Sequence, residues 1–316
     1  MSEQAQVPPP AKSPAARLAG VIFSPGDTFT DIAARPDWIF PLVCYLAVFL
    51  IAFSIYSVRA DWIGIVTDQM EGSSVMKFFP DAARAEMVKK ATEDLRAQTP
   101  GQRAAGTVIQ SLIGILPFIH FVALIHASLF VLMGALRELK LGRAWLNFLL
   151  CIGLMVAFVI VTFISRAAFH DAPQSALLLN GAGALLMTAG WIWLLKRRTD
   201  RDPDLNKVIS VWMYAGAVGI IYMLAILGVS LMTQAPIQAS LDKLVKTNLG
   251  AFMGTGVPIL KAIADSLDLF TLWTLVVLSI GFRAVTKLST GVATSITFLP
   301  WGIVVMIRIA IAAAFG

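Results

Sequence analysis

Two aspartates and an arginine stand at the edges of the last two apolar runs of this chain. Asp265 and Asp268 lie three residues apart just before one run, and Arg308 lies inside the final run. Side chains three residues apart share one side of a helix, so we expect both carboxylates to point the same way. Ionisable groups in or beside lipid are candidates for an ion site, a proton site or an ion pair.

Three interpretations of this candidate polar cluster remain open. In the first, Asp265 and Asp268 only begin a helix, where the helix dipole stabilises acids by roughly 0.3 to 1 kcal/mol. In the second, Asp268 pairs with Arg308, because the last two spans form a hairpin and an unpaired arginine in lipid costs about 2.5 to 3.5 kcal/mol. In the third, the three residues form a transport site together with His120, which lies near the middle of another apolar run.

Signatures of catalysis are missing from the sequence. Neither cysteine nor histidine pairs occur at metal-ligand spacing, and the chain has no His-Glu-x-x-His and no Gly-x-Ser-x-Gly. Three histidines are few for acid–base chemistry. We therefore predict a protein that is not an enzyme and that uses no cofactor and no metal.

The composition indicates a membrane protein. Hydrophobic residues make up 58% of the chain and charged residues 14%, with a mean hydropathy of +0.78. Soluble domains carry about 25% charged residues, so this chain has more apolar surface than a water-soluble core can hide. The net charge of +6 is spread over short loops rather than along one stripe, which argues against nucleic acid as a partner.

The elements that carry the cluster are predicted to be membrane-spanning helices. A span needs about 17 to 25 apolar residues, and seven segments approach this length. We predict an all-α polytopic transmembrane helical bundle of about seven spans, of which the sixth is short. The segments are Trp38–Val58, Thr107–Leu136, Trp145–Ser165, Ser175–Leu195, Val208–Met232, Ser266–Phe282 and Gly291–Phe315.

The region before the first span divides into two parts. Residues 1–14 are predicted to be a disordered tail, and residues 15–36 to form one or two amphipathic helices on the membrane surface. Ser24 can cap a helix that begins at Pro25, and Pro36 ends it. An ordinary entry segment without a partner is the alternative. The transmembrane domain then covers residues 37–316.

Short basic loops predict the orientation. Lysine and arginine in short loops favour the cytoplasmic side. The strongest such loop contains Lys196, Arg197, Arg198 and Arg201. We therefore expect a cytoplasmic N-terminus, a C-terminus outside, and outer loops at 59–106 and 234–264. The first outer loop carries a helical pattern from Pro80 to about Ala97.

Two stretches resemble the Yip family, the Ypt/Rab-interacting membrane proteins, in its prokaryotic branch. One is FSPGDTFTDIAARPDWIFPL before the first span; the other is LDLFTLWTLVVLSIGFRAVTKLSTGVA. In the second, the matching residues are Asp268, Phe270, Trp273, Gly281 and Lys287. The family usually has five spans, so the surplus here is Trp145 to Leu195.

The resemblance implies a function in membrane organisation or partner recruitment. Eukaryotic relatives are linked to Rab GTPases and vesicle traffic. For this chain we expect an integral protein of the bacterial cytoplasmic membrane. Its partners would be the lipid bilayer, anionic headgroups bound by Lys196, Arg197, Arg198 and Arg201, and another membrane or cytoplasmic protein. The alternative is a small-solute or ion transporter that uses the polar cluster.

Overall fold

The described part of the chain is built of helices. This computed structural model describes residues 12–72, 79–99, 205–234, 236–253 and 257–315, with isolated positions between 76 and 183. Within these ranges the ordered elements are helices, and two isolated backbone bridges are the only β pairing. The all-α prediction is confirmed for this part of the protein.

Four helical runs are long and apolar enough to cross a membrane. They are α3 (Ile39–Arg59), the run of α9 (Leu205–Ala215) and α10 (Ala217–Met232), α13 (Leu269–Thr286) and α14 (Thr290–Phe315). They correspond to four of the seven predicted spans. The other three lie almost wholly outside the described residues, so the count of seven stays a prediction.

α3 has two distinct sides that follow from its sequence. Its 21 residues give a length of about 31 Å, close to the roughly 30 Å of a bilayer core. Tyr45, Phe49, Phe53 and Tyr56 recur every three or four residues, and neighbouring rings stack with centroids 5.3 to 6.4 Å apart. This aromatic side packs on α10, where a Cβ at Gly219 would lie 3.2 Å from the Tyr45 ring. The opposite side is exposed.

A second core joins the N-terminal helices to the bundle. α1 (Pro14–Phe23) and α2 (Pro25–Ala34) bury Val21, Phe29 and Ile32 against residues of α9 and α13. The short helices predicted within 15–36 are therefore present. They pack on the ends of other helices rather than lying without a partner.

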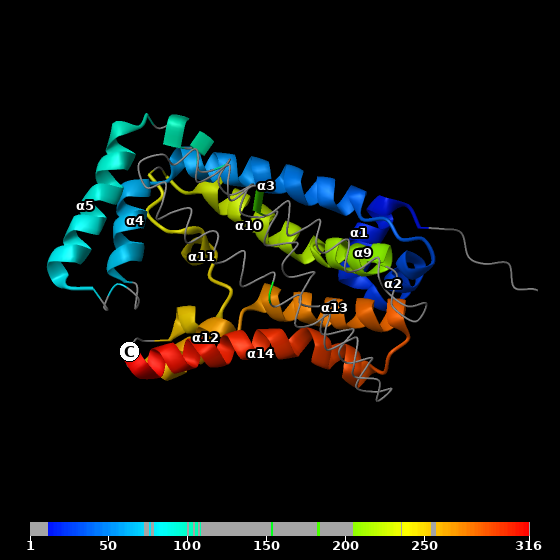
Figure 1. Cartoon of the computed structure of the whole chain (residues 1–316). Coiled ribbons are helices and arrows are strands. Elements are labelled where there is room, and N and C mark those ends of the chain that lie inside the picture. Colours follow the sequence, from blue (N-terminus) through cyan, green and yellow to red (C-terminus); the bar gives the residue numbers. More distant parts are fainter. Residues whose placement is uncertain are drawn as a thin grey trace, which may run out of the picture.

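The described helices alternate in direction between two ends of the molecule (Figure 1). α1, α2 and the α13–α14 turn lie at one end, here named the α1–α2 end. The opposite α4–α5 end holds α4 (Trp62–Glu71), α5 (Asp81–Ala97) and the C-terminal end of α14. It also holds α11 (Leu241–Leu244), the short η2 (Leu249–Phe252) and α12 (Pro258–Ser266). The predicted helix of the first outer loop is α5; α4 and α12 were not predicted.

Arg59 ties two spans together at the α4–α5 end. Its guanidinium donates hydrogen bonds to the carbonyls of Ser230 and Thr233, where α10 ends. The last carbonyls of a helix lack intrahelical donors, and a cation there also complements the helix dipole. The backbone just beyond continues the join, since Ile237 donates to the Arg59 carbonyl at 2.8 Å.

Candidate functional site

The helix that the sequence predicts around the two aspartates is broken between them. α12 ends at Ser266, Leu267 leaves the helical conformation, and Asp268 is the N-cap of α13. Asp265 and Asp268 therefore belong to two different helices. The expectation that they share one side of a single helix was wrong, because spacing alone does not reveal a break.

Both carboxylate oxygens of Asp268 accept hydrogen bonds. Its Oδ1 accepts from the Thr271 backbone N–H at 2.7 Å, and its Oδ2 accepts from the Thr247 hydroxyl. The backbone of the same loop completes the join, since Leu269 donates to the Thr247 carbonyl at 3.1 Å. The first interpretation, a capped helix start, therefore describes Asp268 well.

Asp265 pairs within its own helix. Lys261, one turn earlier, places its Nζ 3.0 Å from each carboxylate oxygen. Both side chains are 36% exposed, so the pair contributes little to stability. The loop of η2 packs closely here, and a Cβ at Gly250 would collide with this carboxylate. The backbone at Gly250 therefore packs closely against Asp265.

Arg308 is not brought together with the aspartates by any bond. It is exposed on α14, and among the described residues no ion pair or hydrogen bond joins it to Asp268. Both oxygens of Asp268 are already used by Thr247 and Thr271. The predicted Asp268–Arg308 clamp is not formed in this structure.

His120 of the candidate polar cluster lies outside the described residues, as do all four residues of the predicted lipid or partner surface: Lys196, Arg197, Arg198 and Arg201.

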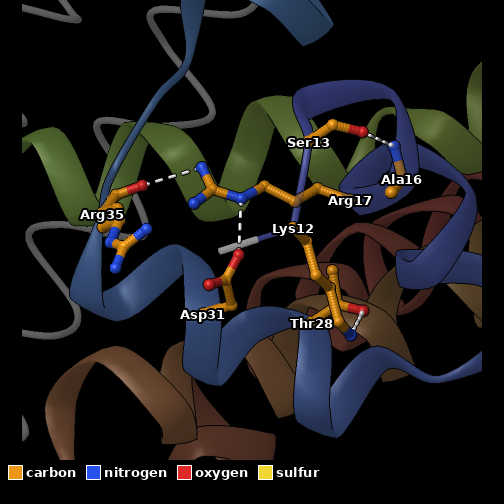
Figure 2. A network of polar contacts seen from close by, with 7 residues as sticks. All are labelled: Lys12, Ser13, Ala16, Arg17, Thr28, Asp31 and Arg35. Atoms are coloured by element: carbon orange, nitrogen blue, oxygen red, sulfur yellow. Dashed lines mark hydrogen bonds and ion pairs between the residues drawn. The ribbon is translucent and has the colours of Figure 1, made fainter. Parts of the chain in front are cut away.

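A polar network at the α1–α2 end was not predicted (Figure 2). Arg17 of α1 has a side chain only 6% exposed, and its Nε donates to Oδ2 of Asp31 in α2 at 2.7 Å. Its Nη1 donates to the Arg35 carbonyl, where α2 ends, at 2.9 Å. Nearby, Lys12 donates to the Thr28 hydroxyl at 3.1 Å. The guanidinium of Arg17 thus bonds both to a side chain of α2 and to the backbone at the C-terminal end of that helix.

The charge of Arg17 is stabilised by its partners. Burial by itself lowers the pKa of Arg17, but the hydrogen bond to Asp31, the interaction with the Tyr214 hydroxyl and the charge of Asp31 together outweigh it and leave that pKa raised. A buried charge without such a partner would be strongly destabilising. The ion pair therefore joins α1 to α2 without leaving a buried charge unpaired.

The sequence does contain a signal for this pair. Arg17 stands next to Leu18 and four residues before Val21, on the apolar side of its helix. A cation on an apolar face needs an anion from a neighbouring helix, because an unpaired buried charge is costly. α2 contains two acids, Asp27 in its first turn and Asp31 one turn before its end, and Asp31 is the one that pairs with Arg17.

The described polar groups mostly cap helix ends or join neighbouring helices. No group of three or more histidine, cysteine or acidic residues able to hold a metal occurs within the described ranges. Asp268 caps the start of α13, Arg17 joins α1 to α2, and Asp265 pairs with Lys261 within α12. The chain matches no family model, no curated protein and no solved structure.

Proposed function

We propose that this chain is a non-catalytic, multi-pass membrane protein of Yip type that recruits a partner at its cytoplasmic face. Its four long apolar helices make it a membrane protein. The sequence resemblance supports the family, and the structural roles of Asp265, Asp268 and Arg17 support a function without catalysis. In this proposal the protein is located in the bacterial cytoplasmic membrane, with the α1–α2 end on the cytoplasmic side and the C-terminus on the outer side.

The observation that carries the proposal is the fixed position of the α1–α2 pair. α1 and α2 share a core with α9 and α13, and the buried Arg17–Asp31 pair holds them together. Phe23, the last residue of α1, is 85% exposed. An aromatic side chain on a rigid element loses little freedom when a partner covers it, which suits it to an interface.

Basic residues complete the proposed cytoplasmic face. Lys196, Arg197, Arg198 and Arg201 would attract anionic headgroups at about 1 kcal/mol for each basic residue near the surface. Replacing the first three by glutamine should weaken association of the soluble loop peptide with liposomes. Unchanged association would remove anionic lipid from the list of partners.

A crosslinking experiment tests recruitment. A photoreactive amino acid at Phe23 in the full-length protein, in native membranes, should give a discrete adduct with another polypeptide. The matched control is Thr30, which is exposed on α2 and lies away from the turn at Phe23. Adducts with phospholipid only at Phe23, or the same adducts at Thr30, would contradict the proposal.

The alternative is a transporter, and one observation favours it. The break between α12 and α13 resembles the discontinuous helices at which transporters bind their substrates. Purified protein in proteoliposomes should then move protons or a solute, and Asp268→Asn should stop it. Flux that depends on Asp268 would favour the transporter over the recruitment proposal.

A further inference from the structure

The segment between α10 and α13 carries an apolar patch that was expected to lie in an outer aqueous loop. The predicted loop covers 234–264, yet its second half presents large apolar side chains at the surface. Phe252 is 78% exposed, Leu249 56% and Val257 55%. The apolar patch comprises Leu249, Phe252, Met253, Val257, Ile259, Leu260 and Ile263.

α12 is amphipathic, and its two sides face different surroundings. Ile259, Leu260 and Ile263 recur along one exposed side, as helical spacing requires. Ala264 and Ser266 are buried on the side that faces the protein. So many exposed large apolar groups within a short segment mark a contact surface, because water around them is unfavourable.

The lengths of the last two spans place this patch at membrane depth. α13 has 18 residues and α14 has 26, so α14 runs about 12 Å further from their common turn. α12 packs against α14, and Figure 1 shows it beside the C-terminal part of α14, beyond the end of α13. α12 and η2 therefore lie at the depth that α14 reaches and the shorter α13 does not.

α14, the candidate span against which α12 packs, also exposes large apolar side chains. On α14, Ile303, Val304 and Ile307 are each at least half exposed, with Arg308 beside them. Lys261 of α12 is a second basic group beside the patch, and it pairs with Asp265. Apolar side chains flanked by long basic ones suit the boundary between acyl chains and phosphate headgroups.

We propose that η2 and α12 lie within the lipid leaflet at the α4–α5 end, with the apolar patch in contact with phospholipid acyl chains. α12 and α13 then form one discontinuous membrane segment, joined at Leu267 and Asp268. The occupant of the patch is lipid, and neither water nor a second copy of the chain covers it. This assignment depends on the membrane location of α14 and not on the proposed recruitment function.

Nitroxide labels in the full-length protein test the assignment. Single cysteines would replace Phe252 and Leu260 in a background without Cys44 and Cys151, and the protein would be reconstituted in phosphatidylcholine–phosphatidylglycerol vesicles. Collisions with oxygen, which partitions into lipid, are compared with collisions with a water-soluble nickel chelate. Ile307→Cys on α14 is the lipid control, and Glu86→Cys, exposed on α5, is the water control.

The proposal expects labels at Phe252 and Leu260 to match the Ile307 label, with oxygen accessibility well above nickel accessibility. Three results would overturn it. Labels that behave like the Glu86 label would place the patch in water. Dipolar broadening between labels would show that a second copy covers it, and protection from both reagents would show that another protein surface does.

Discussion

Arg17 and Asp31 form an ion pair across the α1–α2 interface, with Nε 2.7 Å from Oδ2 and the arginine side chain only 6% exposed. Removing one member of a buried pair leaves the other charge without a partner, which costs several kcal/mol. We expect Asp31→Ala to lower the free energy of unfolding in detergent by about 2 to 3 kcal/mol. The control is Asp81→Ala, since Asp81 is 90% exposed and pairs with Arg84; its loss should be within about 1 kcal/mol. Equal losses of stability in Asp31→Ala and Asp81→Ala would show that burial does not make the Arg17–Asp31 pair more important.

The pH dependence of this pair should be flat on the basic side. A group whose pKa is raised on folding stabilises the folded state below its unfolded pKa and loses that contribution only as the pH rises through the folded pKa. For Arg17 that window lies above the ordinary arginine pKa, so the guanidinium stays charged from about pH 6 to about pH 10. The difference in stability between the parent and Arg17→Gln should therefore stay constant over this range. A difference that shrinks toward pH 10 would show that another group supplies the effect.

Gly281 is a test of packing between helices. A Cβ there would lie 2.5 Å from Cγ1 of Val211 and 3.0 Å from the Phe29 ring, so these side chains or α13 itself would have to shift. We expect Gly281→Ala to destabilise the protein by about 1 to 3 kcal/mol, measured by thermal unfolding in detergent. Gly302→Ala is the matched control, because nothing lies within 4 Å of its Cβ position on α14. That change should be neutral or stabilise by about 0.5 to 1 kcal/mol.

A hydroxyl pair joins the last two spans. Ser279 of α13 and Thr297 of α14 are buried and hydrogen-bonded to each other. Such bonds between membrane helices contribute about 0.6 kcal/mol on average. A double-mutant cycle with Ser279→Ala and Thr297→Val should give a coupling of this size. Ser295→Ala, an exposed site that bonds only within α14, should change stability by less than about 0.5 kcal/mol. Zero coupling would mean that the hydroxyls do not interact.

Asp268 and Arg308 should act independently. Asp268→Ala removes the N-cap of α13 and should cost about 1 kcal/mol, while Asp268→Asn keeps an acceptor for Thr271 and should cost less. Arg308→Ala should have almost no effect, because Arg308 is exposed and bonds to no described residue. Exchange of the two residues should therefore not restore stability. If the exchange restored stability, the two residues would form an ion pair after all.

Much of the helical framework is predictable from the sequence. Pro25 and Pro36 bound α2, and the structure places this helix at Pro25–Ala34. The leading acids and trailing bases of α5 predict a helix from Pro80 to Ala97, and it is observed at Asp81–Ala97. The positions of prolines and the lengths of apolar runs are local properties of the sequence, so they can be recognised without knowledge of the fold.

Contacts between distant residues could not be predicted in this way. The spacing of Asp265 and Asp268 predicts a shared helical face, yet the loop at Thr247 pairs with the backbone beside Asp268 and ends α12. Likewise, α12 lies mostly within the predicted outer loop 234–264 and was not predicted. Both features depend on contacts between chain segments about twenty residues apart. The apolar pattern of the nine residues of α12 does not reveal those contacts.

The threading of the chain through the membrane is the central claim, and cysteine labelling tests it most directly. Single cysteines at Glu86 on α5, at Lys287 in the α13–α14 turn and at Arg198 would be exposed to a membrane-impermeant maleimide in spheroplasts, before and after permeabilisation. We predict labelling of Glu86→Cys in intact spheroplasts, and labelling of Lys287→Cys and Arg198→Cys only after permeabilisation. Labelling of Glu86→Cys and Lys287→Cys from the same side, or of Arg198→Cys from the side opposite Lys287→Cys, would contradict the account.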